Sequence, residues 1–105
     1  MRGEDEWNER DYRSRSSRKH KKWEKLNLID VREVAEVQED HIPGIINIPL
    51  GLLEFRLQEL NKNTPYIIIC RSGGRSGQAT EFLTYHGYDA TNMVGGMLAF
   101  KGNVE

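Results

Sequence analysis

The hydrophobic and polar positions divide the chain near residue 26. Between Met1 and Lys25 there is no Val, Ile, Leu or Phe, and fifteen of these 25 residues are charged. Such a stretch buries too little apolar surface to offset the entropy lost when a chain is ordered. From Leu26 onward, short apolar runs alternate with polar segments. We therefore expect a charged leader over 1–25 that is disordered or weakly helical, and a single folded domain over 26–105.

Apolar runs in the domain predict the strands of a parallel sheet. The run "LNLIDV" (26–31) is short and ends near an acid, as a buried parallel strand does. The run "YIIIC" (66–70) holds four β-forming residues without polar alternation, which is typical of a central strand covered on both faces. Shorter runs over 45–48 and 88–94 predict two further strands.

Helical patterns lie between these runs. They cover 32–40, 50–60, 78–87 and 95–102. Leu53, Leu57 and Leu60 recur at helical spacing, which predicts an amphipathic helix over 50–60. Gly87 is placed to end the helix that begins at 78. Strands that alternate with helices through short loops are typical of an α/β fold with a parallel sheet.

The charge pattern separates the leader from the domain. The net charge of −1 combines nine Lys or Arg and six Asp or Glu in 1–25 with six and ten in 26–105, so the leader is basic and the domain is acidic. The run "RSRSSRKHKK" (13–22) could contact nucleic acid, but we expect a solvated tail.

Three absences bear on the compartment. A single cysteine forms no internal disulfide, and no apolar run approaches the roughly 18–20 residues that cross a bilayer. The N-terminus has no apolar region of the signal-peptide kind. We expect a cytoplasmic protein that does not bind membranes.

The single cysteine occurs in the stretch "IIICRSGGRSG" (67–77). In open α/β sheets, ligands bind beyond the carboxyl ends of the strands, where the backbone N–H groups of a turn and a helix start converge on one point. We expect Gly73 and Gly74 to adopt positive φ so that these groups face inward, and Ser76 to cap the following helix.

Cys70 lies at the centre of this predicted anion site. The neighbouring dipoles and the charges of Arg71 and Arg75 should lower the pKa of its thiol, and the thiolate is the nucleophilic form. No general base is then required, and neither His20, His41 nor His86 is obviously placed to act as one. The alternative, a cysteine packed as a small hydrophobic residue, gains nothing from two arginines.

Four motifs between Leu26 and about Lys101 resemble the single-domain rhodanese family, the thiosulfate sulfurtransferase-type module. "LIDVRE" (28–33) is similar to the opening strand with its Asp-Val-Arg signature. "DHIPGIINIP" (40–49) is similar to the family's His-Ile-Pro-Gly-Ala-Ile-Asn-Ile-Pro. "CRSGGRS" (70–76) resembles the active-site loop Cys-Arg-x-Gly-x-Arg-Ser, and "GGMLAF" (95–100) the closing Gly-Gly-Met-x-Ala-Trp.

This resemblance implies a rhodanese-like three-layer α/β/α fold with a mainly parallel central sheet of four or five strands, and neither a cofactor nor a metal. It implies that Cys70 is the nucleophile that carries a persulfide. Asp30 and Arg32 match the first signature and would support the loop. The implied substrate-binding residues are Arg71, Ser72, Gly73, Gly74, Arg75 and Ser76. The amides of 71–75 would hold the transferred sulfur, and the two arginines would meet the sulfonate of the donor.

The implied activity is a sulfurtransferase that moves sulfane sulfur from a donor such as thiosulfate to a thiol or cyanide. A persulfide carrier or regulatory module without fast turnover is one alternative, and a protein of a sulfur relay would then be its partner. Phosphatases and arsenate reductases of related fold are another, but their loop is Cys-x5-Arg. Here Cys70 and Arg75 form the shorter Cys-x4-Arg, and Ser76 stands where the longer loop carries arginine.

The leader departs from the family pattern, which usually begins with a short strand and a helix. Residues 1–25 have about the right length and the wrong composition. Two explanations stay open: the protein lacks this edge strand, or the leader is a stretch not native to the gene.

Overall fold

The computed structural model describes residues 6–7, 27–102 and 104–105, and its strands form one parallel sheet. The strands run in the order β1-β5-β4-β2-β3, and every neighbouring pair is parallel. Their bounds are Glu6–Trp7 (β1), Asn27–Asp30 (β2), Ile46–Asn47 (β3), Tyr66–Ile69 (β4) and Ala90–Met93 (β5). The predicted α/β class with a parallel sheet of four or five strands is confirmed.

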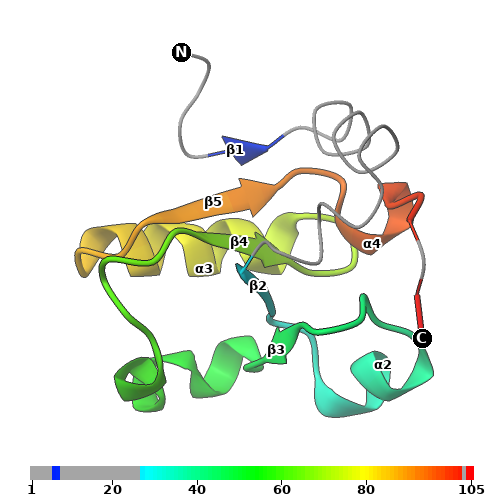
Figure 1. Cartoon of the computed structure of the whole chain (residues 1–105), viewed down its shortest axis with the longest axis horizontal. Helices are drawn as coiled ribbons and strands as arrows, with labels where there is room; N and C mark the ends of the chain where they lie inside the picture. Colours follow the sequence, from blue (N-terminus) through cyan, green and yellow to red (C-terminus); the bar gives the residue numbers. More distant parts are fainter. Residues whose placement is uncertain (1–5, 8–26, 103) are drawn as a thin grey trace.

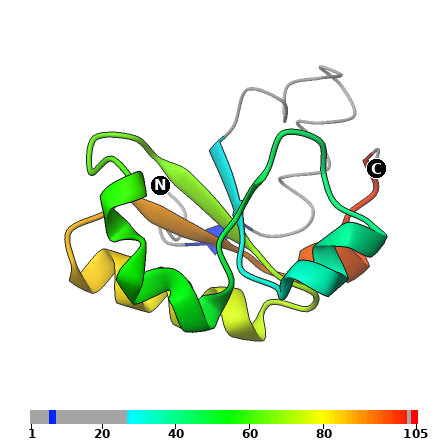
Figure 2. The ribbon, with the colours of Figure 1, turned by 90° about the horizontal axis from the view of Figure 1, so that it is seen from below.

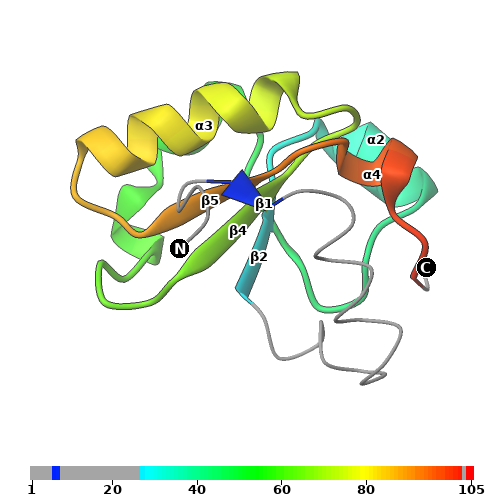
Figure 3. The same cartoon turned by 90° about the horizontal axis from the view of Figure 1, so that it is seen from above.

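Some of the helices flank this sheet, and others lie beyond its carboxyl edge. They are α2 (Val34–Glu39), the 3₁₀ helices η2 (Leu50–Phe55) and η3 (Leu57–Glu59), α3 (Gly74–Tyr85) and α4 (Gly96–Ala99). Helix α3 runs along one face of the sheet, with η2 beside it (Figure 2). Helices α2 and α4 both lie on the side of the molecule toward which the arrows of β4 and β5 point (Figures 1 and 3).

Strand β4 is the centre of the core. All four of its residues are buried, because it lies between β2 and β5 and is covered on both faces. Its side chains alternate between two clusters, as the period of a strand requires. Ile68 packs with Ala79 and Leu83 of α3, whereas Ile67 and Ile69 pack with a second cluster on the opposite face. The sequence-based prediction of a central strand is confirmed.

One predicted helix is wrong. The leucines at helical spacing predicted a single amphipathic helix over 50–60, but the segment forms η2 and η3 instead. Arg56, at φ −123°, ends the first and begins the second. Leu53 is buried against α3 all the same. Burial of the leucines does not distinguish an α-helix from shorter 3₁₀ segments that present the same side chains.

Helix α3 begins four residues earlier than the predicted start at 78. Gly73, with φ +111°, precedes its first residue, so Gly74 to Gly77 belong to the first turn rather than to a loop. The helix ends as expected, with Gly87 in the left-handed region two residues beyond Tyr85. In the leader, Glu6–Trp7 pair with β5. The other leader residues lie outside the described residues. The prediction that the leader is disordered or not native to the gene therefore stays a prediction for them.

A buried ion pair fixes the end of β2. Asp30 and Arg32 have exposed fractions of 0% and 4%. Arg32 donates from Nε and Nη2 to the two carboxylate oxygens of Asp30 at 3.0 and 2.8 Å, and from Nη2 to the carbonyl oxygen of Asp40 at 2.7 Å. Burial by itself lowers the pKa of Arg32, but these hydrogen bonds and charges raise it overall. The pair therefore ties β2 to the segment that leads into β3.

We predict that Arg32→Met destabilises the protein by about 3–5 kcal/mol, because removing one partner leaves the Asp30 carboxylate buried without its counter-charge. Arg56→Met is the matched control. Arg56 pairs with Glu59 at 2.7 Å on the surface, where such ion pairs contribute little to stability. Urea unfolding of both variants measures the difference, and equal losses would contradict the assignment.

Candidate active site

Cys70 lies directly after β4, where the chain turns from the centre of the sheet into α3. Its side chain is 1% exposed. Because β4 is flanked by β2 and β5, the segments that follow these three strands meet at one edge of the sheet. The structure thus places the cysteine where the sequence predicted an anion site.

The sulfur of Cys70 faces hydrogen-bond donors from the first turn of α3. The backbone N–H groups of Gly73 and Ser76 donate to Sγ, at nitrogen–sulfur distances of 3.1 and 3.3 Å. The Ser76 hydroxyl lies 3.3 Å from the same sulfur. Gly73 makes this possible through its positive φ, a conformation that other residues rarely adopt.

These donors act on the ionisation of the thiol. Burial is the largest single influence and raises the pKa of Cys70, because it disfavours the charged form. Hydrogen bonds from the Ser76 side chain and from the amides of Ser76, Gly73 and Ser72 oppose it. The net result is a pKa below the ordinary value for a thiol. Its direction agrees with the expectation from the sequence.

Ser76 does not cap α3, contrary to the sequence-based prediction. The helix begins two residues before it, and Gly73 occupies the cap position without a side-chain hydrogen bond. The buried hydroxyl instead lies between the thiol and Asn92, donating to Asn92 Oδ1 at 2.5 Å. Gly74, also expected at positive φ, has no such conformation, because it lies inside the helix.

Asn92 of β5 is a residue of the site that sequence reasoning missed. The signal that could have found it is a polar side chain in the middle of an apolar strand pattern, "ATNM", whose four residues are all buried. A buried side-chain amide requires hydrogen-bond partners, and this one has them in Ser76 and Gly73.

Arg75 points to α2 and forms an ion pair there. Its Nη1 and Nη2 donate to the two carboxylate oxygens of Glu36 at 2.7 and 3.0 Å. The hydrogen bond from Arg75 is the main reason that the pKa of Glu36 falls to about 2. Glu36 also accepts a hydrogen bond from the amide of Glu33, and the two form a capping box at the start of α2. Sequence reasoning did not single out Glu36.

The remaining predicted site residues differ in their placement. Arg71 and Ser72 are exposed on the loop, and the Arg71 side chain makes no hydrogen bond or ion pair with another described residue. Arg32 donates hydrogen bonds to Asp30 and to Asp40, rather than to the cysteine loop. The predicted supporting role of Asp30 and Arg32, and the substrate-binding role of residues 71–76, stay predictions.

Neither described histidine approaches the thiol. His41 Nδ1 donates to the carbonyl oxygen of Val37 at 2.9 Å, and its Nε2 lies 3.4 Å from a Glu105 carboxylate oxygen. The ring of His86 packs on the rings of Phe82 and Tyr85. His20 lies outside the described residues. The site among the described residues thus holds a thiol and donors, without a neighbouring imidazole.

Helix α4 closes the loop from the other side. The amides of Met97 and Leu98 donate to the carbonyl oxygens of Cys70 and Arg71 at 2.8 and 3.0 Å. Gly96, with φ +54°, allows this approach, since a Cβ there would lie 2.4 Å from the Cys70 carbonyl oxygen. A glycine at position 96 is therefore a packing requirement of the cysteine loop.

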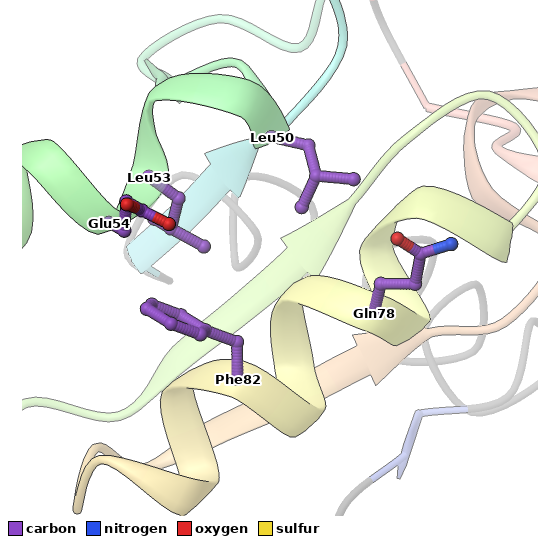
Figure 4. Close-up of a pocket in the computed structure, with 5 residues that line it drawn as sticks. All are labelled: Leu50, Leu53, Glu54, Gln78 and Phe82. Carbon is purple, nitrogen blue, oxygen red and sulfur yellow. The ribbon is translucent and has the colours of Figure 1, made fainter.

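A groove beside α3 is separate from the thiol. It has a volume of about 220 Å³, and Leu50, Leu53 and Glu54 of η2 face Gln78 and Phe82 of α3 across it (Figure 4). No residue of the loop 70–76 is among those that line it.

The described part of the chain holds neither a candidate metal site nor a candidate membrane span. No group of three or more His, Cys, Asp or Glu side chains could hold a metal ion. No helix there is both long and apolar enough to cross a membrane.

We predict that Gly96→Ala destabilises the protein and alters the alkylation rate of Cys70. A left-handed conformation costs a non-glycine residue about 1–2 kcal/mol, and the new Cβ must also displace the Cys70 carbonyl. Gly51→Ala is the control, because a Cβ at Gly51 meets nothing within 4 Å. Unfolding and alkylation by iodoacetamide measure both effects. Indistinguishable variants would show that α4 does not shape the loop.

The Glu36–Arg75 pair predicts a pH dependence of stability. A carboxyl whose pKa is lowered on folding stabilises the protein above its unfolded value of about 4.5, and this contribution is lost as pH falls through about 2. Glu36→Gln should therefore lower the unfolding free energy at pH 7, by less than about 1 kcal/mol because the pair is partly exposed. The difference from the wild type should vanish near pH 2.

Glu39→Gln, an exposed change on the same helix, serves as the control for that comparison. Chemical unfolding at a series of pH values measures all three proteins. A wild-type advantage over Glu36→Gln that grows toward low pH would contradict the ion pair's role.

Comparisons with known proteins agree with this geometry. The family model of the rhodanese-like domain matches residues 15–103. The chain is 45% identical over 69 residues to the putative sulfur carrier protein YrkF of Bacillus subtilis, covering 65% of this chain and 37% of that protein. It is 38% identical over 62 residues to the thiosulfate sulfurtransferase PspE of Escherichia coli, covering 57% and 60%.

The fold agrees as well. The solved structure of a rhodanese-like domain protein from Staphylococcus aureus superimposes with a TM-score of 0.79 at 31% identity, covering 93% of each chain. The chain spans 37% and 60% of the lengths of the two relatives named above, so they contain further sequence that it does not match. With its parallel sheet and its thiol held at the start of α3, this chain belongs to the rhodanese-like domain family.

Proposed function

We propose that this rhodanese-like protein is a sulfurtransferase that moves a sulfane sulfur from a thiosulfate-like donor to a thiol or to cyanide, through a persulfide on Cys70. One observation carries the proposal. A single buried thiol accepts hydrogen bonds from two backbone N–H groups, of Gly73 just before α3 and of Ser76 in its first turn, an arrangement that suits an anionic sulfur rather than an apolar side chain.

In the first step the Cys70 thiolate attacks the outer sulfur of thiosulfate. A bond forms between Sγ and that sulfur, the sulfur–sulfur bond of thiosulfate breaks, and sulfite leaves with its electron pair. The product is a Cys70 persulfide, with the negative charge on its terminal sulfur. Amides of the loop and of the α3 start are the groups that would stabilise this charge, as preorganised dipoles do without reorganising.

In the second step the acceptor attacks the terminal sulfur. Cyanide forms thiocyanate, or a thiolate forms a new persulfide, and the bond to Sγ breaks so that the Cys70 thiolate is restored. The same donors to Sγ make the thiolate a good leaving group. Two half-reactions through one covalent intermediate give ping-pong kinetics.

The two arginines of the loop divide their roles in this proposal. Arg75 is occupied by Glu36, so it holds α2 against α3. Arg71 follows Cys70 in the chain, is exposed, and is the cation we assign to the sulfonate end of the donor. This differs from the sequence-based expectation, in which both arginines meet the donor.

A persulfide carrier is the second candidate. The 45% identity to a protein named as a putative sulfur carrier favours it. Enzyme and carrier share the Cys70 persulfide and differ in the donor. A carrier receives sulfur from a partner protein and turns over free thiosulfate slowly.

We predict that mass spectrometry of the intact protein after thiosulfate treatment shows one added sulfur, and that Cys70→Ser shows none and forms no thiocyanate from thiosulfate and cyanide. Arg71→Met should slow the thiosulfate step about tenfold or more, because a hydrogen bond to a charged group contributes about 1.5–3 kcal/mol. Arg56→Met, a surface change at η2–η3, should react like the wild type.

The results separate the candidates. If the Cys70→Ser protein still gains one sulfur on thiosulfate treatment, both the enzyme and the carrier proposals are overturned. A persulfide that forms from a sulfur-loaded protein donor, but only slowly from thiosulfate, would favour the carrier.

A further inference from the structure

Asn92 uses both ends of its side-chain amide within the site. It is 8% exposed, on the strand next to β4. Its Oδ1 accepts the Ser76 hydroxyl at 2.5 Å, and its Nδ2 donates to the Gly73 carbonyl oxygen at 3.4 Å. The opposite amide orientation would set two carbonyl oxygens against each other at Gly73. The contact with Gly73 therefore fixes which end faces Ser76.

The Ser76 hydroxyl has one hydrogen and two possible acceptors. A carbonyl oxygen carries no hydrogen, so the hydrogen in the Ser76–Asn92 contact belongs to Ser76. While that hydrogen points at Asn92, the hydroxyl oxygen can only accept at the sulfur, 3.3 Å away, from the S–H of the neutral thiol. When Cys70 is a thiolate, the hydroxyl can help it only by turning its hydrogen from Asn92 to Sγ.

We propose that Asn92 is a positioning residue: it keeps the hydrogen of the Ser76 hydroxyl pointing away from Cys70 Sγ until the sulfur becomes an anion. The rotation needs no movement of heavy atoms, since only the hydroxyl hydrogen changes place. In the thiol the hydrogen lies on the Asn92 side, and in the thiolate it lies on the sulfur side. Asn92 thus competes with the sulfur for the hydrogen, and its removal favours the thiolate.

The charged groups around the thiol do not compete with the sulfur for the Ser76 hydroxyl hydrogen. Arg75 of α3 is paired with Glu36 of α2, and Arg71 is the exposed residue that follows Cys70. The flanking elements β5, with "ATNM", and α4, with "GMLA", carry no charged side chain. Gly73 also keeps a hydrogen bond without Asn92, because its carbonyl oxygen accepts the Gly77 amide at 3.0 Å.

The inference rests on the proposed function in that Cys70 reacts as an anion, but its test reads ionisation rather than turnover. The midpoint of Cys70 ionisation is followed by the ultraviolet absorbance of the thiolate and by the pH dependence of alkylation. Four proteins are compared: the wild type, Asn92→Leu, Ser76→Ala and the double variant. Circular dichroism checks that each is folded, and Asn92→Ala replaces Asn92→Leu if leucine unfolds the chain.

Ser76→Ala should raise the midpoint by about one pKa unit, because the thiolate loses a hydrogen bond. Asn92→Leu should lower it by about half a unit to one unit, because the hydroxyl no longer has a competing acceptor. In the Ser76→Ala background the Asn92 change should have no such effect. This dependence separates positioning from a general change in packing or polarity, which would shift the midpoint in both backgrounds.

A midpoint that rises or stays unchanged in Asn92→Leu with Ser76 present would overturn the inference. An equal shift with and without Ser76 would overturn it too. Failure of the proposed function looks different: the midpoints move as stated while the wild type forms no persulfide with any sulfur donor.

Discussion

The rest of the structure depends on one interaction: Cys70 is 1% exposed, and hydrogen bonds from the surrounding chain lower the pKa of its thiol in spite of that burial. Taking a charge out of water is unfavourable unless hydrogen bonds compensate for the lost solvation. Here the compensation comes from the backbone, through the amides of Gly73 and Ser76. Backbone donors hold their direction only if the chain holds its shape, so the chemistry of Cys70 is inseparable from the geometry of the turn between β4 and α3.

That geometry is maintained from several elements at once. Within the turn, the left-handed backbone of Gly73 aims the amides at the sulfur. Across the turn, α4 binds the carbonyl oxygens of Cys70 and Arg71, so both hydrogen-bonding sides of the loop are satisfied. Beneath it, β4 is packed on two faces and cannot slide, because a one-residue shift would exchange its two sets of buried side chains. The parallel strand order brings these parts to one edge of the sheet.

The sequence predicts the parts of this arrangement that are local. The isoleucine run identifies the central strand, and the cysteine with its glycines identifies the turn, because these signals lie within about ten residues of each other. The sequence does not predict partners distant along the chain. Arg75 and Glu36 are 39 positions apart, and Ser76 and Asn92 are 16 apart. Ser76 resembles a helix cap in the sequence because the predicted helix begins at 78, whereas α3 begins four residues earlier, at Gly74. The prediction of one helix over 50–60 is wrong for a different reason, because the spacing of leucines indicates burial and not the type of helix.

The distribution of charge follows from the same geometry. Two arginines beside a cysteine indicate, from sequence, a thiolate stabilised by cations, but Glu36 neutralises one of them. What remains against the sulfur itself are neutral dipoles in direct contact, and these are screened little by salt because no solvent lies between donor and acceptor. In the proposed function, the exposed guanidinium of Arg71 would act on a different species, the dianionic donor arriving from water, where attraction is long-ranged and salt-sensitive. On that proposal, holding the anionic sulfur and attracting the anionic donor would be separate tasks, carried by the backbone and by a side chain respectively.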